Sequence, residues 1–323
     1  MATSSVSKSD PYDHLHIALN LDGTITRLLT HPTVEANPEA TSGDAVVCKD
    51  WTLNAQNKTW LRIYRPTRLP SNDNTIARLP IIIYFHGGGF ILFSAKTKTS
   101  HEKCCEYASE IPAIVVSLDY RLAPECRLPA QYEDAIDAII WVKEQIVDPN
   151  GVQWLKDYGD FSRCYIGGRG SGGNIAFNAA LRALDLDLNP LKISGLVLNQ
   201  PMFGGMERKN SELQHAEDPL MPLSVLDLMW DLSLPLGTDR DHSFCNPLVD
   251  GPHKIKIGSL GRCLVTGFCG DIMFERMRDF VTMLVASGVK VEARFQDDGF
   301  HNADFVDAQW ALNLLNKIKE FVI

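Results

Sequence analysis

Residues 163–184 have the sequence RCYIGGRGSGGNIAFNAALRAL, and this stretch gives the clearest indication of the fold. The first four residues form a short strand-like run, and from Asn174 onward apolar residues recur at helical spacing. Between these runs, five of the seven residues from Gly167 to Gly173 are glycine. Glycine tolerates positive φ and close backbone approach, so the stretch predicts a strand that turns sharply into a helix.

Strand-like and helix-like segments alternate along the rest of the chain. Apolar runs rich in β-branched residues predict strands at Leu79–Phe85, Ala113–Leu118, Arg163–Ile166, Ile193–Leu198, Cys263–Thr266 and Val289–Phe295. Amphipathic spacing predicts helices at Glu133–Glu144, Asn174–Leu184, Glu275–Ser287 and Asp307–Phe321. This alternation predicts an α/β fold, with a doubly wound, mostly parallel sheet and helices on both faces.

Two segments stand outside the alternation. Trp51–Tyr64 has the pattern of an antiparallel edge hairpin, and Met202 to about Pro247 is rich in Met, Leu, Pro and Trp. Within a single domain spanning 1–323, we expect residues 202–247 and about 1–40 to form a cap over the carboxyl ends of the strands. Ligands bind at that edge of open α/β sheets, so the site should lie under the cap. Candidates for its apolar lining, or for the core of the cap, are Met221, Leu223, Leu226, Met229 and Trp230.

The composition indicates a globular protein with a small partner. The 323 residues carry a formal net charge of −9, which argues against nucleic acid and anionic membranes as partners because both are bound by clustered Lys and Arg. The start of the chain lacks the apolar run of a secretory signal, and no stretch reaches the roughly 18 apolar residues of a membrane span. We therefore expect a cytoplasmic protein. The eight cysteines are scattered, so we expect no disulfide framework, no metal and no cofactor.

A second glycine cluster, HGGGF at residues 86–90, directly follows the predicted strand Leu79–Phe85. Three successive residues without Cβ leave backbone N–H groups bare where a ligand oxygen can approach, as stabilisation of an oxyanion requires. If the motif stood alone, a tight turn that uses glycine for positive φ would be the alternative.

Three of the predicted strands are followed, in chain order, by an elbow-like glycine turn, an aspartate and a histidine. The turn after Arg163–Ile166 has the G-x-S-x-G spacing of a nucleophile elbow, but Gly170 occupies its centre. Asp271 follows the predicted strand Cys263–Thr266, and His301 follows the predicted strand Val289–Phe295. In such an order the carboxylate fixes the tautomer of the imidazole and stabilises its cation, while the imidazole moves a proton. Singly, these residues are more often a turn aspartate and an ordinary histidine, but their joint placement favours catalysis.

The chain resembles the plant carboxylesterase family, the hormone-sensitive-lipase-like branch of the α/β-hydrolases, which also includes gibberellin receptors and alkaloid-forming cyclases. The matching segments extend over nearly the whole chain and are Leu21–Arg27, His86–Phe90, Asp119–Glu125, Pro129–Asp134, Gly172–Asn174, Gly270–Asp271 and His301. The resemblance implies an α/β-hydrolase fold of about eight strands with a helical cap. It also implies an oxyanion hole made by Gly87, Gly88 and the backbone N–H of Ser171, with Asp271 and His301 as acid and base of the triad.

The chain departs from the family pattern where the covalent chemistry would occur. Gly170 matches the catalytic serine, Arg169 stands where the family has a small or acidic residue, and Ile272-Met273 replaces a common Pro-Leu. Glycine has no side chain that could attack an ester. Ser171 is a poor substitute, because the residue after the nucleophile begins the helix and its hydroxyl should point away from His301. We expect Arg169 to line the substrate pocket with Met221, Leu223 and Trp230.

A dinucleotide site is a different interpretation of the same glycines. Gly168, Gly170 and Gly173 have the G-x-G-x-x-G spacing between a strand and a helix. That fingerprint also needs an acidic residue at the end of the second strand, to hold the ribose hydroxyls. Here the second strand ends in Asn199-Gln200, so a dinucleotide site is disfavoured.

Three functions remain at this point. The first is an enzyme in which His301, held by Asp271, acts as general acid or base beside the oxyanion hole, in elimination, cyclisation, decarboxylation or non-covalent hydrolysis of a small apolar plant metabolite. The second is a non-catalytic receptor for a small molecule, of the gibberellin-receptor type. The third is an ordinary carboxylesterase that uses Ser171, or one in which Gly170 has been introduced deliberately.

Overall fold

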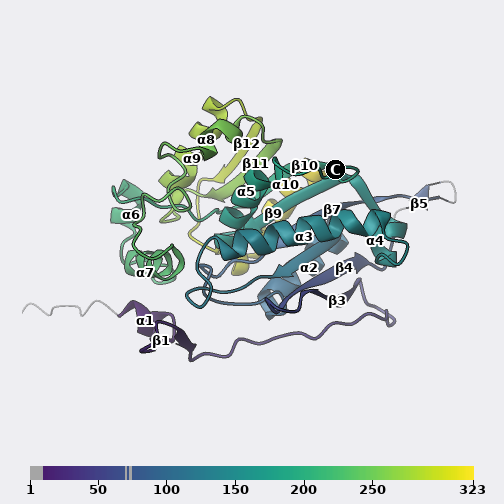
Figure 1. Ribbon diagram of the computed structural model, residues 1–323, viewed down its shortest axis with the longest axis horizontal. Coiled ribbons are helices and arrows are strands. Elements are labelled where there is room, and N and C mark those ends of the chain that lie inside the picture. Colours follow the sequence, from purple (N-terminus) through teal and green to yellow (C-terminus); the bar gives the residue numbers. More distant parts are fainter. Residues whose placement is uncertain (1–9, 70, 73–74) are drawn as a thin grey trace, which may run out of the picture.

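The computed structural model describes residues 10–69, 71–72 and 75–323, and its centre is an eight-stranded sheet (Figure 1). The strand order is β12-β11-β10-β9-β7-β8-β4-β3. The strands are β3 (Val46–Asn54), β4 (Thr59–Pro66), β7 (Leu79–Phe85), β8 (Ile114–Asp119), β9 (Gly159–Arg169), β10 (Ile193–Asn199), β11 (Arg262–Phe268) and β12 (Val291–Gln296). The six strands from β7 onward pair in parallel, and β4 and β3 add an antiparallel edge. The expected mostly parallel sheet of an α/β fold is therefore confirmed.

The strand order reverses beside β7, which pairs with β8 on one side and with β9 on the other. From β9 the chain proceeds outward through β10 and β11 to β12. Ligand sites of open α/β sheets lie at the carboxyl ends of the strands at such a reversal. The glycine loop after β7 and the glycine turn after β9 both occur there.

Helices cover both faces of the sheet. The helices are α1 (Pro11–His14), α2 (Lys98–Glu110), α3 (Ala130–Val147), α4 (Gln153–Tyr158), α5 (Ser171–Ala183), α6 (Asn210–Gln214), α7 (Leu223–Ser233), α8 (His253–Ile257), α9 (Phe274–Ala286) and α10 (Ala308–Val322), with a 3-10 turn η1 (Ala303–Phe305). Helices α2 and α10 pack on one face, against residues such as Ile82 and Tyr84 of β7. Helices α3, α5 and α9 pack on the other face, against Ile81 and Ile83. Successive side chains of a strand point to opposite faces, so the continuous apolar run of β7 serves both cores.

The structure differs from the sequence prediction in two elements of the sheet layer. β9 begins at Gly159, four residues before the predicted start. Helix α2 was not predicted, because its buried side chains are small or polar and its stripe lacks the leucines on which a hydrophobic pattern depends. The buried residues of α2 are Ser100, Lys103, Cys104, Tyr107 and Ala108.

The N-terminal part of the chain lies beside residues 202–247. Helix α1 is followed by a two-stranded hairpin of β1 (Ile17–Leu19) and β2 (Ile25–Arg27), and α1 lies next to α7 (Figure 1). His14 Nε2 is 3.4 Å from the carbonyl oxygen of Leu220. Arg27 anchors the hairpin through a 2.8 Å ion pair with Glu125 and a 2.7 Å hydrogen bond from Nε to the carbonyl of Ile91. A second small hairpin, β5 (Ser71–Asn72) with β6 (Thr75–Ile76), lies at the far end of the molecule.

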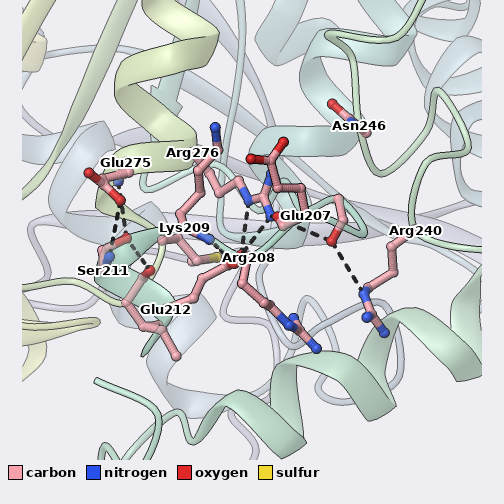
Figure 2. A network of polar contacts seen from close by, with 12 residues as sticks. Glu207, Arg208, Lys209, Ser211, Glu212, Arg240, Asn246, Glu275 and Arg276 are labelled. Carbon is pink, nitrogen blue, oxygen red and sulfur yellow. Dashed lines mark hydrogen bonds and ion pairs between the residues drawn. The ribbon is translucent and has the colours of Figure 1, made fainter. Parts of the chain in front are cut away.

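Helix α6 is joined to α9 by a polar network (Figure 2). Arg276 of α9 forms a buried 2.9 Å ion pair with Glu212 of α6 and also donates to the carbonyl of Glu207 at 2.5 Å. Ser211 Oγ donates to the carbonyl of Ile272 at 2.9 Å. These contacts hold the segment from 202 onward against the turn that carries Asp271. Within the described residues, none of the helices is both long and apolar enough to cross a membrane.

Candidate active site

His301 and Asp271 come together at the carboxyl edge of the sheet. Asp271 lies in the turn after β11 and His301 in the loop after β12, and Nδ1 of the imidazole is 2.9 Å from Oδ2 of the carboxylate. Both residues are buried, and the other carboxylate oxygen accepts the N–H of Met273 at 2.9 Å. A carboxylate can only accept, so the proton of the neutral imidazole lies on Nδ1. Nε2 is then free to take a proton from a molecule in the cavity that His301 lines.

Gly170 forms the sharp turn between β9 and α5. Its φ of 54° and ψ of −119° lie in a region that L side chains rarely adopt, as expected for a strained strand-to-helix turn. The turn is held by the Gly170 carbonyl, which accepts the N–H groups of Met202 at 2.9 Å and Asn174 at 3.2 Å. A Cβ at position 170 would meet no atom within 4 Å. The space that a side chain would occupy at this turn is therefore open, and Gly170 lines the same cavity as His301.

The glycine loop after β7 presents backbone donors to the cavity. Among the described residues, no acceptor is found for the N–H groups of Gly87, Gly88 or Ser171, and all three residues line the cavity. Gly88 has φ of 116°, and a Cβ there would lie 2.3 Å from the carbonyl oxygen of Leu92, so only glycine fits. The loop is fixed from behind by Tyr120, whose hydroxyl donates to the carbonyl of His86 at 2.9 Å. Preorganised donors of this kind can stabilise a developing oxyanion.

The Ser171 hydroxyl is not connected to His301. Its Oγ is buried and has no partner with hydrogen-bond geometry among the described residues. Ser171 does affect the phenol of Tyr120. Burial raises the pKa of that phenol, and the Ser171 hydroxyl lowers it to a smaller extent. Because no base contacts the hydroxyl, the geometry gives Ser171 no means of activation as a nucleophile.

The glycine loop, the turn and His301 line one cavity of about 340 Å³. Leu15 from the N-terminal segment and five residues of the 202–247 segment close its apolar side, namely Met202, Leu220, Met221, Leu226 and Met229. Other lining residues include Met273 and Phe305. Of the six residues that were candidates for the pocket lining, Arg169, Met221, Leu226 and Met229 do line the cavity.

Leu223 and Trp230 do not line this cavity, which corrects the prediction for both. On α7 the residues that line the cavity are Leu226 and Met229, whereas Trp230 is not among the lining residues. Trp230 is fully buried and its ring centroid lies 5.4 Å from that of Phe90, in the core beneath the cap segment. Leu223 is half-buried against the same core.

The charge of Arg169 is paired with another side chain of the protein. Its guanidinium forms a buried bidentate ion pair with Asp304 at 2.6 and 2.5 Å, and Nε donates to Oδ1 of Asn302 at 2.8 Å. The guanidinium carbon also lies 4.0 Å from the ring centroid of Phe305. Arg169 thereby ties the turn at Gly170 to the residues that directly follow His301. Nothing in the sequence pattern distinguished Asn302 or Asp304 as its partners.

Replacing Arg169 by Met is expected to lower the free energy of unfolding by about 3–5 kcal/mol, because the charge of Asp304 would remain buried with only the 3.4 Å hydrogen bond from Gln200 Nε2 among the described side chains. Arg163→Met is the matched control, since the 2.7 Å ion pair of Arg163 with Asp160 lies on the same strand but is partly exposed. There the expected loss is about 1 kcal/mol or less. Equal losses in denaturant unfolding of the two variants would contradict the structural role of Arg169.

The ion pair between Arg169 and Asp304 makes the free energy of unfolding depend on pH. Burial raises the pKa of the Asp304 carboxyl, but the Arg169 guanidinium outweighs burial and holds that pKa below its ordinary value. The stabilisation is therefore present at neutral pH and is lost as the pH falls through the folded-state pKa, below about pH 4. The stability difference between the wild type and Arg169→Met should shrink in that acid range.

This arrangement of glycine loop, strand-to-helix turn, carboxylate and histidine is that of an α/β-hydrolase. Residues 82–305 match the family described as alpha/beta hydrolase fold. Probable carboxylesterase 9 of Arabidopsis thaliana is 54% identical over all of both chains. A 3-O-acetylpapaveroxine carboxylesterase of Papaver somniferum is 45% identical over 97% of this chain and 100% of that protein. A fungal esterase structure from Rhizomucor miehei superposes with a TM-score of 0.73 at 26% identity, over 87% of this chain and 83% of that one. The chain belongs to the plant carboxylesterase family.

Proposed function

We propose that this carboxylesterase-family protein is an enzyme that works without a covalent nucleophile. His301, oriented by Asp271, moves a proton, and the N–H groups of Gly87, Gly88 and Ser171 stabilise the oxyanion that forms. The observation that carries the proposal is the buried 2.9 Å contact between His301 and Asp271 beside a turn whose central residue, Gly170, has no side chain. A protein that only binds a ligand has no chemical need of that pair.

In a hydrolytic reaction, Nε2 of His301 takes a proton from a water molecule whose oxygen attacks the acyl carbon. The carbonyl oxygen becomes the oxyanion held by the glycine loop, and the proton passes to the departing alkoxide, which regenerates the neutral imidazole. The open space at Gly170 leaves room for that water. Asp271 stabilises the imidazolium between the two transfers.

In an elimination or cyclisation, the same groups act on a carbonyl compound. Nε2 takes the proton from the carbon next to the carbonyl, and the enolate oxygen occupies the oxyanion hole. The electron pair then expels a leaving group from the neighbouring carbon, and the imidazolium can protonate that group. Neither course forms a bond to the protein, so both suit a site that lacks a serine at position 170.

The lining of the cavity supports a small, largely apolar plant metabolite with an ester or carbonyl group as substrate. Residues 202–247 and the N-terminal segment form the cap that closes the cavity, and they contribute most of the leucines and methionines of its wall. A relative from Papaver somniferum has a name that specifies an acetyl ester, 3-O-acetylpapaveroxine. An acyl ester of a specialised metabolite is therefore the substrate class that we favour.

A non-catalytic receptor is the second candidate, and the observation that favours it is Gly170 itself. The two candidates predict different results for His301→Ala: an enzyme loses turnover, whereas a receptor changes only in ligand affinity. An esterase that uses Ser171 is the least supported alternative, because the Ser171 hydroxyl makes no hydrogen bond to an activating base among the described residues.

Incubation with para-nitrophenyl acetate is expected to give no burst of nitrophenolate, and a serine-directed fluorophosphonate should leave the protein unlabelled. The reason is the absent hydroxyl at position 170 together with the unactivated Ser171. Stopped-flow absorbance and intact-protein mass spectrometry measure the two results. The Gly170→Ser variant is the positive control for labelling. Stoichiometric labelling of the wild type at Ser171 would overturn the proposal in favour of a surrogate nucleophile.

A further inference from the structure

The wall of the cavity contains a second polar group of residues, on the first turns of α2. Thr99, Ser100 and Lys103 line the cavity together with the glycine loop and His301. Residues three and four positions apart share one face of a helix, so both hydroxyls lie on the same side of α2 as the Lys103 side chain. Lys103 is 8% exposed and Ser100 is 9% exposed, so both are buried in the free protein.

Several hydrogen-bond donors of this group are uncommitted. Within the described part of the chain, the backbone N–H groups of Thr99 and Ser100, in the first turn of α2, have no acceptor, and neither hydroxyl caps the helix. The Lys103 ammonium carries three donors, and its one carboxylate partner is Glu106, at 2.5 Å. Thr99 is exposed and the Ser100 residue is buried at the cavity wall, so a ligand that supplies acceptor oxygens can pair with these donors in place of water.

The charges of the residues that line the cavity also favour the binding of an anion. Lys103 and Arg169 are the two cationic residues among the lining residues, and no carboxylate of an Asp or Glu is among them. Arg169 is neutralised by Asp304, and the carboxylate that pairs with Lys103 is that of Glu106, which is partly exposed behind the wall. The N-terminus of the 13-residue helix α2 adds the positive end of the helix dipole. One partly compensated ammonium suits a singly charged carboxylate better than a doubly charged phosphate.

The α2 group is joined to the catalytic end of the cavity by Phe305. The ring centroid of Phe305 lies 4.0 Å from the guanidinium carbon of Arg169 and 6.0 Å from the Lys103 ammonium. Lys103 is also close enough to Asp304 to help lower the pKa of that carboxyl. An apolar spacer that packs on Phe305 would therefore connect a group at the glycine loop with a group at Lys103.

We propose that Thr99, Ser100 and Lys103 form a carboxylate subsite, so that the substrate carries an acidic group separated by an apolar spacer from the ester or carbonyl that reacts. This inference rests on the proposed function in one respect, namely that the cavity is the substrate site. It names a substrate class: amphipathic carboxylic acids, including half-esters of dicarboxylic acids. Lys103 is a specificity-determining residue and takes no part in the proton transfer.

Binding of phenylvalerate and of its neutral analogue phenylvaleramide, measured by titration calorimetry, tests the subsite without any turnover. The wild type is expected to bind the carboxylate about ten- to a hundredfold more tightly than the amide, as charge-assisted hydrogen bonds imply. Lys103→Met should abolish this preference and leave the affinity for the amide nearly unchanged. Ser100→Ala should reduce the preference by a smaller factor. Lys98→Met is the matched control, since Lys98 is on the same helix but exposed and does not line the cavity, and it should retain the full preference.

The unchanged affinity for the amide shows that each variant is folded. An undiminished preference in Lys103→Met would mean that the carboxylate binds elsewhere, for example at the glycine loop, and would overturn the inference. Equal binding of the two probes by the wild type, or binding of neither, would also overturn it. Because binding is measured without chemistry, failure here leaves the proposed reaction at His301 intact, and an inactive wild type would leave the subsite intact.

Discussion

Gly170→Ser is expected to create an acyl-enzyme and to raise the hydrolysis of para-nitrophenyl acetate by at least about 10²-fold. Removal of the serine from a complete triad costs about 2 × 10⁶ in kcat in subtilisin, which is an upper limit for the gain. A Cβ at position 170 would meet no atom within 4 Å, so the cavity can accept the side chain. His301 and the glycine loop line the same cavity as Gly170, so the groups with which a serine would act are present.

Backbone strain is the opposing effect in this variant. A side chain at φ of 54° costs about 1–3 kcal/mol of stability. Gly170→Ala is the matched control, because it carries the same Cβ and the same strain without a hydroxyl. We expect the two variants to lose similar stability in thermal unfolding, and only Gly170→Ser to show a burst in stopped flow. A folded Gly170→Ser that shows no ester turnover would mean that the oxyanion hole or the His301–Asp271 pair is not arranged for catalysis.

His301→Ala should lower turnover of the substrate by about 10²–10⁴-fold, the usual contribution of general acid–base catalysis, while ligand affinity changes much less. In a receptor there is no proton to move. Loss of the imidazole would then alter affinity alone, through a hydrogen bond worth about 0.5–1.5 kcal/mol. Calorimetry and product analysis by mass spectrometry on the same variant separate these outcomes.

Asp271→Asn should follow His301→Ala in direction. The neutral amide no longer stabilises an imidazolium and can orient the wrong tautomer of His301. Turnover that persists unchanged in His301→Ala would leave the glycine loop alone as the catalytic element.

Much of the catalytic end of the cavity could be predicted from the sequence, because its signals are local. Gly88, Gly89 and Gly170 have positive φ values and so mark backbone turns that other residues adopt only with strain. Asp271 and His301 could be placed because parallel strands bring their carboxyl ends to one edge of the sheet. Gly88 illustrates the strength of such a signal, since a Cβ there would collide with the carbonyl of Leu92.

The rest of the site depends on packing that sequence spacing does not encode. Helix α2 was missed because it buries Ser, Lys, Cys, Tyr and Ala side chains, and that helix supplies the wall with Lys103. Trp230 was a candidate for the pocket lining or for the core, and only the folded chain shows that its ring packs against Phe90 in the core. Arg169 could be recognised as unusual beside the turn, but its partner Asp304 is 135 residues away and becomes a neighbour only in the folded chain.

Acetate release and peptide mass mapping, measured on the same quenched samples, test whether His301 transfers a proton without an acyl-enzyme. Para-nitrophenyl acetate reports hydrolysis, and acetoxyethyl methyl ketone allows either hydrolysis or elimination. We predict that the wild type releases acetate from at least one probe, that the peptide containing Gly170 and Ser171 is never acetylated, and that His301→Ala loses the activity. Acetylated Ser171 in the quenched wild type, or acetate release that is equally fast in His301→Ala, would contradict the claim.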